Sequence, residues 1–158
     1  MCHLLKTTAI ASSLVAASFL VGTGMAKAEN IGFSGDVPKT CTFSNVAAGT
    51  LVLDGFDTLS STATGGVAGT VDLTCNTAFT LAVAAPVANG APATGLTLSA
   101  STASAGYGAN TATVGTPAAA LAAVTAQEVT VNMTYTANAT IPAANGYAFN
   151  VAVTATPD

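Results

Sequence analysis

The C-terminal stretch Gly146-Tyr-Ala-Phe-Asn-Val-Ala-Val-Thr-Ala-Thr-Pro157 alternates larger apolar side chains with small or polar ones. Because neighbouring residues of a β-strand point to opposite faces, this period of two predicts a strand with one apolar face. Residues 129–135 repeat the pattern, with Thr and Asn in the alternate positions. The two segments predict an all-β protein. Their apolar rows are Tyr147, Phe149, Val151, Val153 and Ala155 in the last strand, and Val129, Val131, Met133 and Tyr135 in the earlier one.

The rest of the chain is rich in Thr, Val, Ala and Gly, and clusters of Gly, Pro and Asn separate short candidate strands. About seven short strands at such spacing are typical of a β-sandwich. Residues 76–78 are few enough to join two strands as a hairpin. Residues 101–117 predict a long loop or a poorly ordered strand pair, whereas residues 117–124 fit a helical turn, a strand or a loop. The other candidate strands are residues 31–37, 50–53, 69–75, 79–84 and 95–99.

Residues 1–28 have the pattern of a secretory signal peptide. Lys6 precedes an apolar run over residues 9–21, and Ala26-Lys27-Ala28 provides the small-x-small pattern of a cleavage site. A retained N-terminal anchor is the alternative, but the run is short and rich in Ala and Ser for a membrane span. We therefore expect an exported protein whose mature part, residues 29–158, is a single domain.

The charge of the mature part excludes one large class of partner. Removal of Lys6 and Lys27 leaves Lys39 as the one basic side chain against seven carboxylates, a net charge of −6. Nucleic-acid binding needs a basic surface that neutralises phosphates. Anionic lipid surfaces attract basic segments for the same reason. We therefore expect neither nucleic acid nor an anionic lipid surface as a partner, and no direct membrane insertion after signal cleavage.

Two cysteines remain after signal cleavage, Cys41 and Cys75. An isolated pair in an exported chain predicts a disulfide. In the chain-entropy description, closing this loop would stabilise the fold by roughly 3–4 kcal/mol. A zinc site would need further ligands, since the mature chain has no His, and the spacing does not fit a redox pair.

Catalytic side chains are scarce. Without His, and with one Lys, the mature chain offers no general base of the usual kind beside a nucleophile. Asp54 and Asp57 leave a two-carboxylate glycosidase formally open, but such sites are normally lined with aromatic residues and the chain has no Trp. The same Asp54-Gly-Phe-Asp57 segment could form part of a calcium loop. The simpler interpretation is a polar turn with Phe56 in the core. We expect no enzyme activity, no cofactor and no metal.

Three groups of motifs resemble the chaperone–usher pilin superfamily. Ile31-Gly-Phe-Ser-Gly-Asp-Val-Pro-Lys-Thr-Cys41 is similar to the alternating strand that leads to the first cysteine of these pilins, and Gly69-Thr-Val-Asp-Leu-Thr-Cys-Asn76 to the strand that carries the second. The Asp54–Asp57 region and the closing segment, residues 146–157, look most like the spore coat protein U branch, which includes archaic pilins.

The resemblance implies an immunoglobulin-like β-sandwich that lacks its last strand, and a structural subunit of a surface fibre or spore-coat-like layer. Such subunits complete their fold by β-strand addition, first from a periplasmic chaperone and then, at the outer-membrane usher, from the next subunit. The last strand, with the row from Tyr147 to Ala155, would border the groove. The candidate donor row is Ile31, Phe33, Gly35 and Val37.

Alternatives remain at this point. Residues 31–37 could instead form the domain's own first strand, because few residues separate the predicted cleavage site from Cys41. The protein would then be a terminal or non-polymerising member. A self-complete secreted β-sandwich that binds a surface or glycan is the main alternative function, and a secreted protein that binds a small ligand or a metal is a third.

Overall fold

The computed structural model describes residues 29–90, 96–144 and 146–158. The predicted signal peptide lies outside these residues. The chain divides into two compact units, Met1–Gly35 and Asp36–Asp158. Residues 29–40 form neither strand nor helix, so the first strand, β1, begins at Cys41. The interpretation of residues 31–37 as the domain's own first strand is therefore wrong.

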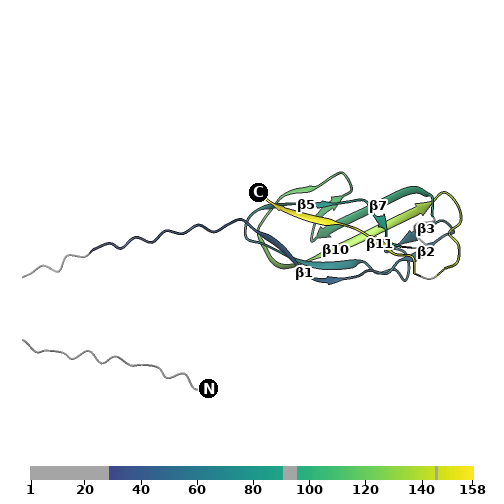
Figure 1. The fold of residues 1–158 in the computed structure, drawn as a ribbon, viewed down its shortest axis with the longest axis horizontal. Coiled ribbons are helices and arrows are strands. Elements are labelled where there is room, and N and C mark those ends of the chain that lie inside the picture. Colours follow the sequence, from purple (N-terminus) through teal and green to yellow (C-terminus); the bar gives the residue numbers. More distant parts are fainter. Residues whose placement is uncertain (1–28, 91–95, 145) are drawn as a thin grey trace, which may run out of the picture. The chain divides into compact units, whose positions relative to one another are not determined.

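The largest sheet is antiparallel and is built around the long strand β10 (Val124–Ala137). One edge of β10 pairs first with β4 (Gly69–Cys75) and then with β3 (Thr58–Ser60), and its other edge pairs with β7 (Leu98–Tyr107). Figure 1 shows β10 running through the middle of the domain beside β7. Three outer strands complete the sheet. They are β1 (Cys41–Ala47) on β4, β2 (Val52–Asp54) on β3, and β8 (Asn110–Thr113) on β7.

Two smaller antiparallel sheets contain the C-terminal segment. In one, β5 (Phe79–Val83) lies between β9 (Ala118–Leu121) and β12 (Val153–Pro157). In the other, β11 (Phe149–Asn150) pairs with β6 (Val87–Ala88). The sequence predicted one strand over the last apolar row, and the structure has two short strands there, β11 and β12.

Strands from the large sheet and from the β5 sheet share one hydrophobic core. The strand predicted at residues 69–75 and the alternation predicted for residues 129–135 are confirmed, since Leu73 and Val129 are fully buried while Asp72 and Thr130 are not. From the other sheet, Phe79 and Leu81 are also fully buried. A set of small side chains completes the core where strands approach closely. These are Ala103, Ala105, Ala112 and Ala137.

The predicted disulfide between Cys41 and Cys75 is present, and it joins directly opposed residues of β1 and β4. The hairpin predicted at residues 76–78 is wrong, because β4 and β5 belong to different sheets and this segment crosses between them. Residues 101–117 are mostly the β7–β8 hairpin rather than a loop, and residues 117–124 contain strand β9. Within the described part of the chain, no helix is long and apolar enough to cross a membrane.

Candidate binding groove

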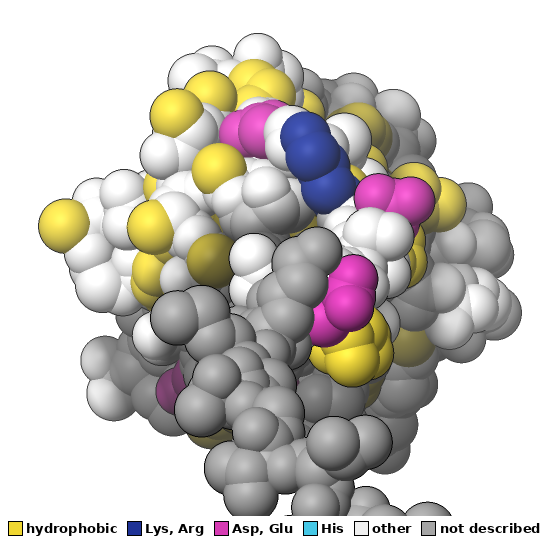
Figure 2. All heavy atoms as spheres, turned by 90° about the vertical axis from the view of Figure 1, so that its left-hand side faces the viewer, with side chains coloured by type: hydrophobic (Ala, Val, Ile, Leu, Met, Phe, Trp, Pro, Cys, Tyr) yellow, Lys and Arg dark blue, Asp and Glu magenta, His cyan; other side chains and the backbone are white. Residues whose placement is uncertain are grey.

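Strands β1 and β12 are edge strands of their sheets. Among residues 29–90, 96–144 and 146–158, β1 pairs only with β4, and β12 pairs only with β5. The Lys39 Nζ donates a hydrogen bond to the Asp158 carbonyl oxygen (2.6 Å), which ties the start of β1 to the end of β12. The two strands therefore run in opposite directions from one end of the domain. Figure 2 looks onto this end, where one basic side chain lies between acidic ones.

A groove of about 620 Å³ lies between β1 and the C-terminal segment. Its floor is formed by β4 and β10, through Val71, Val131 and Met133. Val71 and Met133 are buried and Val131 is half-buried, so the floor is continuous with the core. The groove therefore places apolar side chains of the core between the edge strand β1 and the segment that leads into β12.

The first wall is β1 and the loop that follows it. Phe43, Val46 and Ala47 line the groove, and Val46 is 80% exposed. Asn45 interrupts the alternation of this strand, because its φ of 51° lies in the left-handed region and the pairing register shifts between Ser44 and Ala47. An exposed valine on an unpaired edge is a site at which another strand can add.

Close backbone approach shapes the end of this wall. A Cβ on Gly49 would lie 2.6 Å from the Gly69 nitrogen and 2.6 Å from the Val67 carbonyl oxygen. Only glycine fits there without a shift of the backbone. Thr50 and Val67 form a two-way backbone bridge beside it (2.8 and 2.9 Å), so this loop is fixed against the sheet.

The second wall is the C-terminal segment, and it includes most of the row singled out from the sequence. Tyr147, Phe149, Val151 and Val153 line the groove, whereas Ala155 does not. The ring of Phe149 packs on that of Tyr135 with centroids 4.7 Å apart. The Tyr147 hydroxyl donates to the Pro142 carbonyl oxygen (2.7 Å). These contacts hold both aromatic side chains in place along the groove wall.

The candidate donor residues lie outside every strand. Ile31 is 77% exposed, Phe33 is 94% exposed and Val37 is 82% exposed. Gly35 ends the first compact unit, and Val37 belongs to the second. Residues 31–37 therefore contain three large, exposed apolar side chains, and exposed apolar surface often marks a site of interaction.

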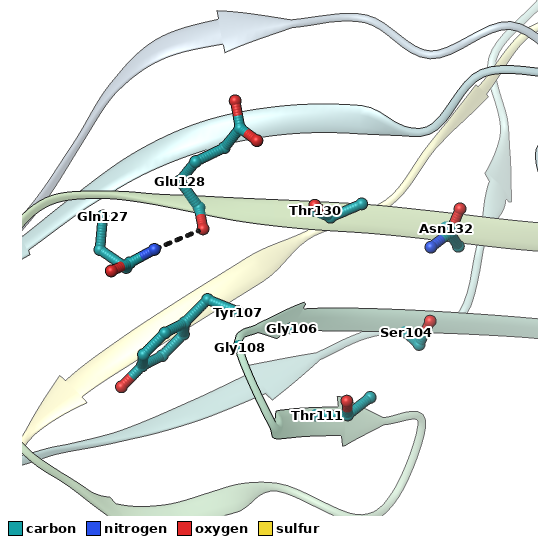
Figure 3. A pocket seen from close by; sticks show the side chains of 9 residues that line it. All are labelled: Ser104, Gly106, Tyr107, Gly108, Thr111, Gln127, Glu128, Thr130 and Asn132. Atoms are coloured by element: carbon teal, nitrogen blue, oxygen red, sulfur yellow. Dashed lines mark hydrogen bonds between the residues drawn. The ribbon is translucent and has the colours of Figure 1, made fainter.

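A second hollow, of about 390 Å³, has a different chemistry. Figure 3 shows that its side chains come from β7, β8 and β10, among them Ser104, Thr111, Thr130 and Asn132. The Gln127 side-chain amide donates to the Glu128 carbonyl oxygen (3.2 Å) at its rim. Hydroxyl and amide groups predominate here, so the hollow offers hydrogen bonds and little apolar surface.

The candidate acidic segment, Asp54–Asp57, forms the turn between β2 and β3. Asp54 ends β2, and the turn to β3 passes through Gly55, whose φ is +77°. Phe56 is 78% exposed, so the prediction that it anchors the turn in the core is wrong. The Asp57 carboxylate accepts a hydrogen bond from the Thr58 hydroxyl (3.1 Å). Among the residues whose positions are given, no group of three or more His, Cys, Asp or Glu side chains is placed to hold a metal.

Sequence reasoning missed the β1 wall. Phe43 and Val46 are three positions apart, and a period-two pattern cannot contain both on one face. The bulge at Asn45 provides the extra residue that brings both to the groove. The signal was the Asn between Ser44 and Val46, since Asn tolerates the left-handed conformation better than most residues.

Comparison with known proteins adds no relative. The chain matches no protein-family model, no curated protein and no solved structure.

Proposed function

We propose that this protein is a structural subunit of a surface fibre (pilus) or spore-coat-like layer, assembled by donor-strand exchange. The observation that carries the proposal is the apolar groove between the free edge of β1 and residues 147–153, which lead into β12. The exposed row of Ile31, Phe33 and Val37 provides an apolar segment of the kind that such a groove accepts.

The strand order supports an immunoglobulin-like β-sandwich that lacks its last strand. One layer would be β1-β4-β10-β7-β8 and the other β12-β5-β9, since both contribute to the same core. A further strand after β12 would occupy the space between β12 and β1. In this proposal, that strand comes from another molecule.

The energy available from such an exchange is large for a small domain. Full burial of one Phe, Ile or Val side chain contributes about 1.5–3 kcal/mol, so three contribute about 5–9 kcal/mol before ordering costs. Backbone hydrogen bonds to two free edges would add to this. A complex of this kind dissociates slowly, because opening it exposes the core.

The proposed partners follow from the groove. A periplasmic chaperone would cover it after export, and an outer-membrane usher would direct its replacement by a neighbouring subunit. The final location would be the cell surface, with a role in adhesion or biofilm, or a secreted layer. The charged state of the mature chain, with one lysine, gives the fibre an acidic surface.

A second candidate function is a self-complete secreted adhesin that binds a glycan or another surface without polymerising. The polar hollow of Figure 3 favours it, because the hydroxyl and amide groups of Ser104, Thr130 and Asn132 suit sugar hydroxyls. In this case the groove would serve no partner strand.

The test compares Phe33→Asp with Phe56→Asp in the full chain, extracted from the surface of the producing cells. Both phenylalanines are highly exposed, but only Phe33 belongs to the proposed donor row. On an SDS gel without heating, we expect a ladder from the wild type and from Phe56→Asp that collapses to one band on boiling. Phe33→Asp should give only the single-subunit band. A ladder from Phe33→Asp, or a single band from the unheated wild type, would contradict the proposal.

A further inference from the structure

The residues immediately before β1 are held in line with that strand by one residue, Asn76. The Asn76 Nδ2 donates to the Pro38 carbonyl oxygen (2.8 Å), and the Thr40 N–H donates to the Asn76 Oδ1 (2.8 Å). The Asn76 backbone N–H also donates to the Thr40 carbonyl oxygen (3.1 Å). These three bonds continue the β1–β4 ladder beyond the disulfide, although residues 38–40 are not part of the strand.

We propose that Asn76 and Pro38 prevent the segment before β1 from folding back into the groove of its own chain, so that a second copy of the chain receives it. This inference rests on the proposed function and adds the residues that direct the donor. It assigns a positioning role to Asn76, which lies outside the groove lining.

The bonds to Asn76 are incompatible with the tight loop that a fold-back needs. A segment that reverses onto the free edge of β1 needs a hairpin, and two-residue loops are the commonest tight connection. If residues 38 and 39 formed the loop, residue 37 would pair with residue 40. Continuing this antiparallel register places Ile31 opposite Val46, which is a groove residue. This loop would require residues 38–40 to leave the direction of β1, which breaks the bonds to Asn76.

Pro38 opposes the same loop in a second way. The turns that suit two-residue hairpins have a positive φ at their first central residue, and proline is restricted to about −65°. The residue that accepts the bond from Asn76 is therefore also the residue least able to begin the reversal.

The remaining loop is too early in the chain. If the Asn76 bonds are kept, residues 36 and 37 form the last possible two-residue loop, and Ile31 then falls opposite Thr42. The β1 wall of the groove begins at Phe43, so the apolar row would stop short of it. A donor on a second chain has no such restriction, because its register is independent of residues 38–40 of the acceptor.

The experiment uses the exported full chain with Asn76→Ala and Pro38→Gly combined. At a fixed concentration, we expect the monomer fraction, measured by size exclusion with light scattering, to rise about tenfold, because two hydrogen bonds that oppose the fold-back are lost. The thermal midpoint of this monomer should exceed that of the Phe33→Asp monomer. Adding Phe33→Asp to the double variant should remove this increase in thermal midpoint. Asn110→Ala, which changes an exposed asparagine of β8, should behave as the wild type.

Two results would overturn the inference. One is a double variant that polymerises as the wild type does, and the other is a monomer whose stability does not depend on Phe33. The single variants Asn76→Ala and Pro38→Gly give the same readouts if the combination does not fold. Binding of a synthetic peptide of residues 29–40 to the Phe33→Asp chain separates the two proposals. If the peptide binds and the double variant still polymerises, only the proposed role of Asn76 and Pro38 is contradicted. If the peptide does not bind, the proposed function is contradicted as well.

Discussion

Removal of the disulfide should destabilise the domain more than any single surface change, because the disulfide secures an edge strand with few other attachments. Strand β1 pairs on one side only, its register shifts within the strand, and every residue after Cys41 is exposed. The crosslink spans a sequence separation of 34 residues. In the chain-entropy description, a loop of this length corresponds to about 3.8 kcal/mol of stability at 25 °C.

The assay is guanidinium denaturation of the monomeric Phe33→Asp chain, followed by circular dichroism because the protein has no Trp. We expect the Cys41→Ala/Cys75→Ala variant to lose about 3–4 kcal/mol of unfolding free energy. Reduction of the unmutated cysteines should give a similar loss, and this control preserves the volume of the Cys75 side chain, which is 2% exposed. A loss below about 1 kcal/mol on reduction would refute the reasoning that the crosslink secures β1.

Three further predictions concern the core, the loop beside the groove and the groove itself. Leu81→Ala should cost about 2–5 kcal/mol of unfolding free energy, because the side chain is fully buried. Leu53→Ala, at a half-exposed position, should cost less than about 1 kcal/mol. Equal losses of unfolding free energy in denaturation would contradict the core assignment. Gly49→Ala should lower the thermal midpoint, because the added Cβ would meet the Gly69 nitrogen at 2.6 Å, and an unchanged calorimetric midpoint would contradict that close approach. Val46→Asp should remove the heat-sensitive ladder, because in the proposed fibre an added strand would cover this exposed side chain. Monomer stability should change by less than about 1 kcal/mol, since the side chain is exposed in the monomer. A normal ladder would contradict strand addition at β1.

The sequence predicted strands well where one face is buried by large side chains. Residues 69–75 were predicted with the bounds that β4 has, because Val71, Leu73 and Cys75 alternate with polar residues. The β7–β8 hairpin was harder to predict. Its buried face consists of Ala103, Ala105 and Ala112, and alanine alternating with Ser, Thr and Gly carries little hydrophobic contrast.

Strand pairing was the other feature that the sequence did not predict, because a local pattern of residues does not indicate which strands pair. The segment at residues 76–78 is short enough for a hairpin, yet it crosses from the large sheet to the β5 sheet, and Asn76 instead binds the residues before β1. Phe56 was expected to anchor a polar turn in the core, but its side chain is 78% exposed beside the turn at Gly55. One wall of the groove was predictable from the alternating C-terminal row, and the other depended on a bulge at Asn45.

The most direct measurement is hydrogen exchange of the Phe33→Asp monomer, followed by mass spectrometry, before and after addition of the peptide of residues 29–40. The account predicts slower exchange in β1 and in residues 147–157, because both free edges gain hydrogen bonds, with no change in β8. Strand β8 is the matched control, since it is also an edge strand but does not border the groove. Unchanged exchange in β1 and β12, or equal protection of β8, would contradict the account.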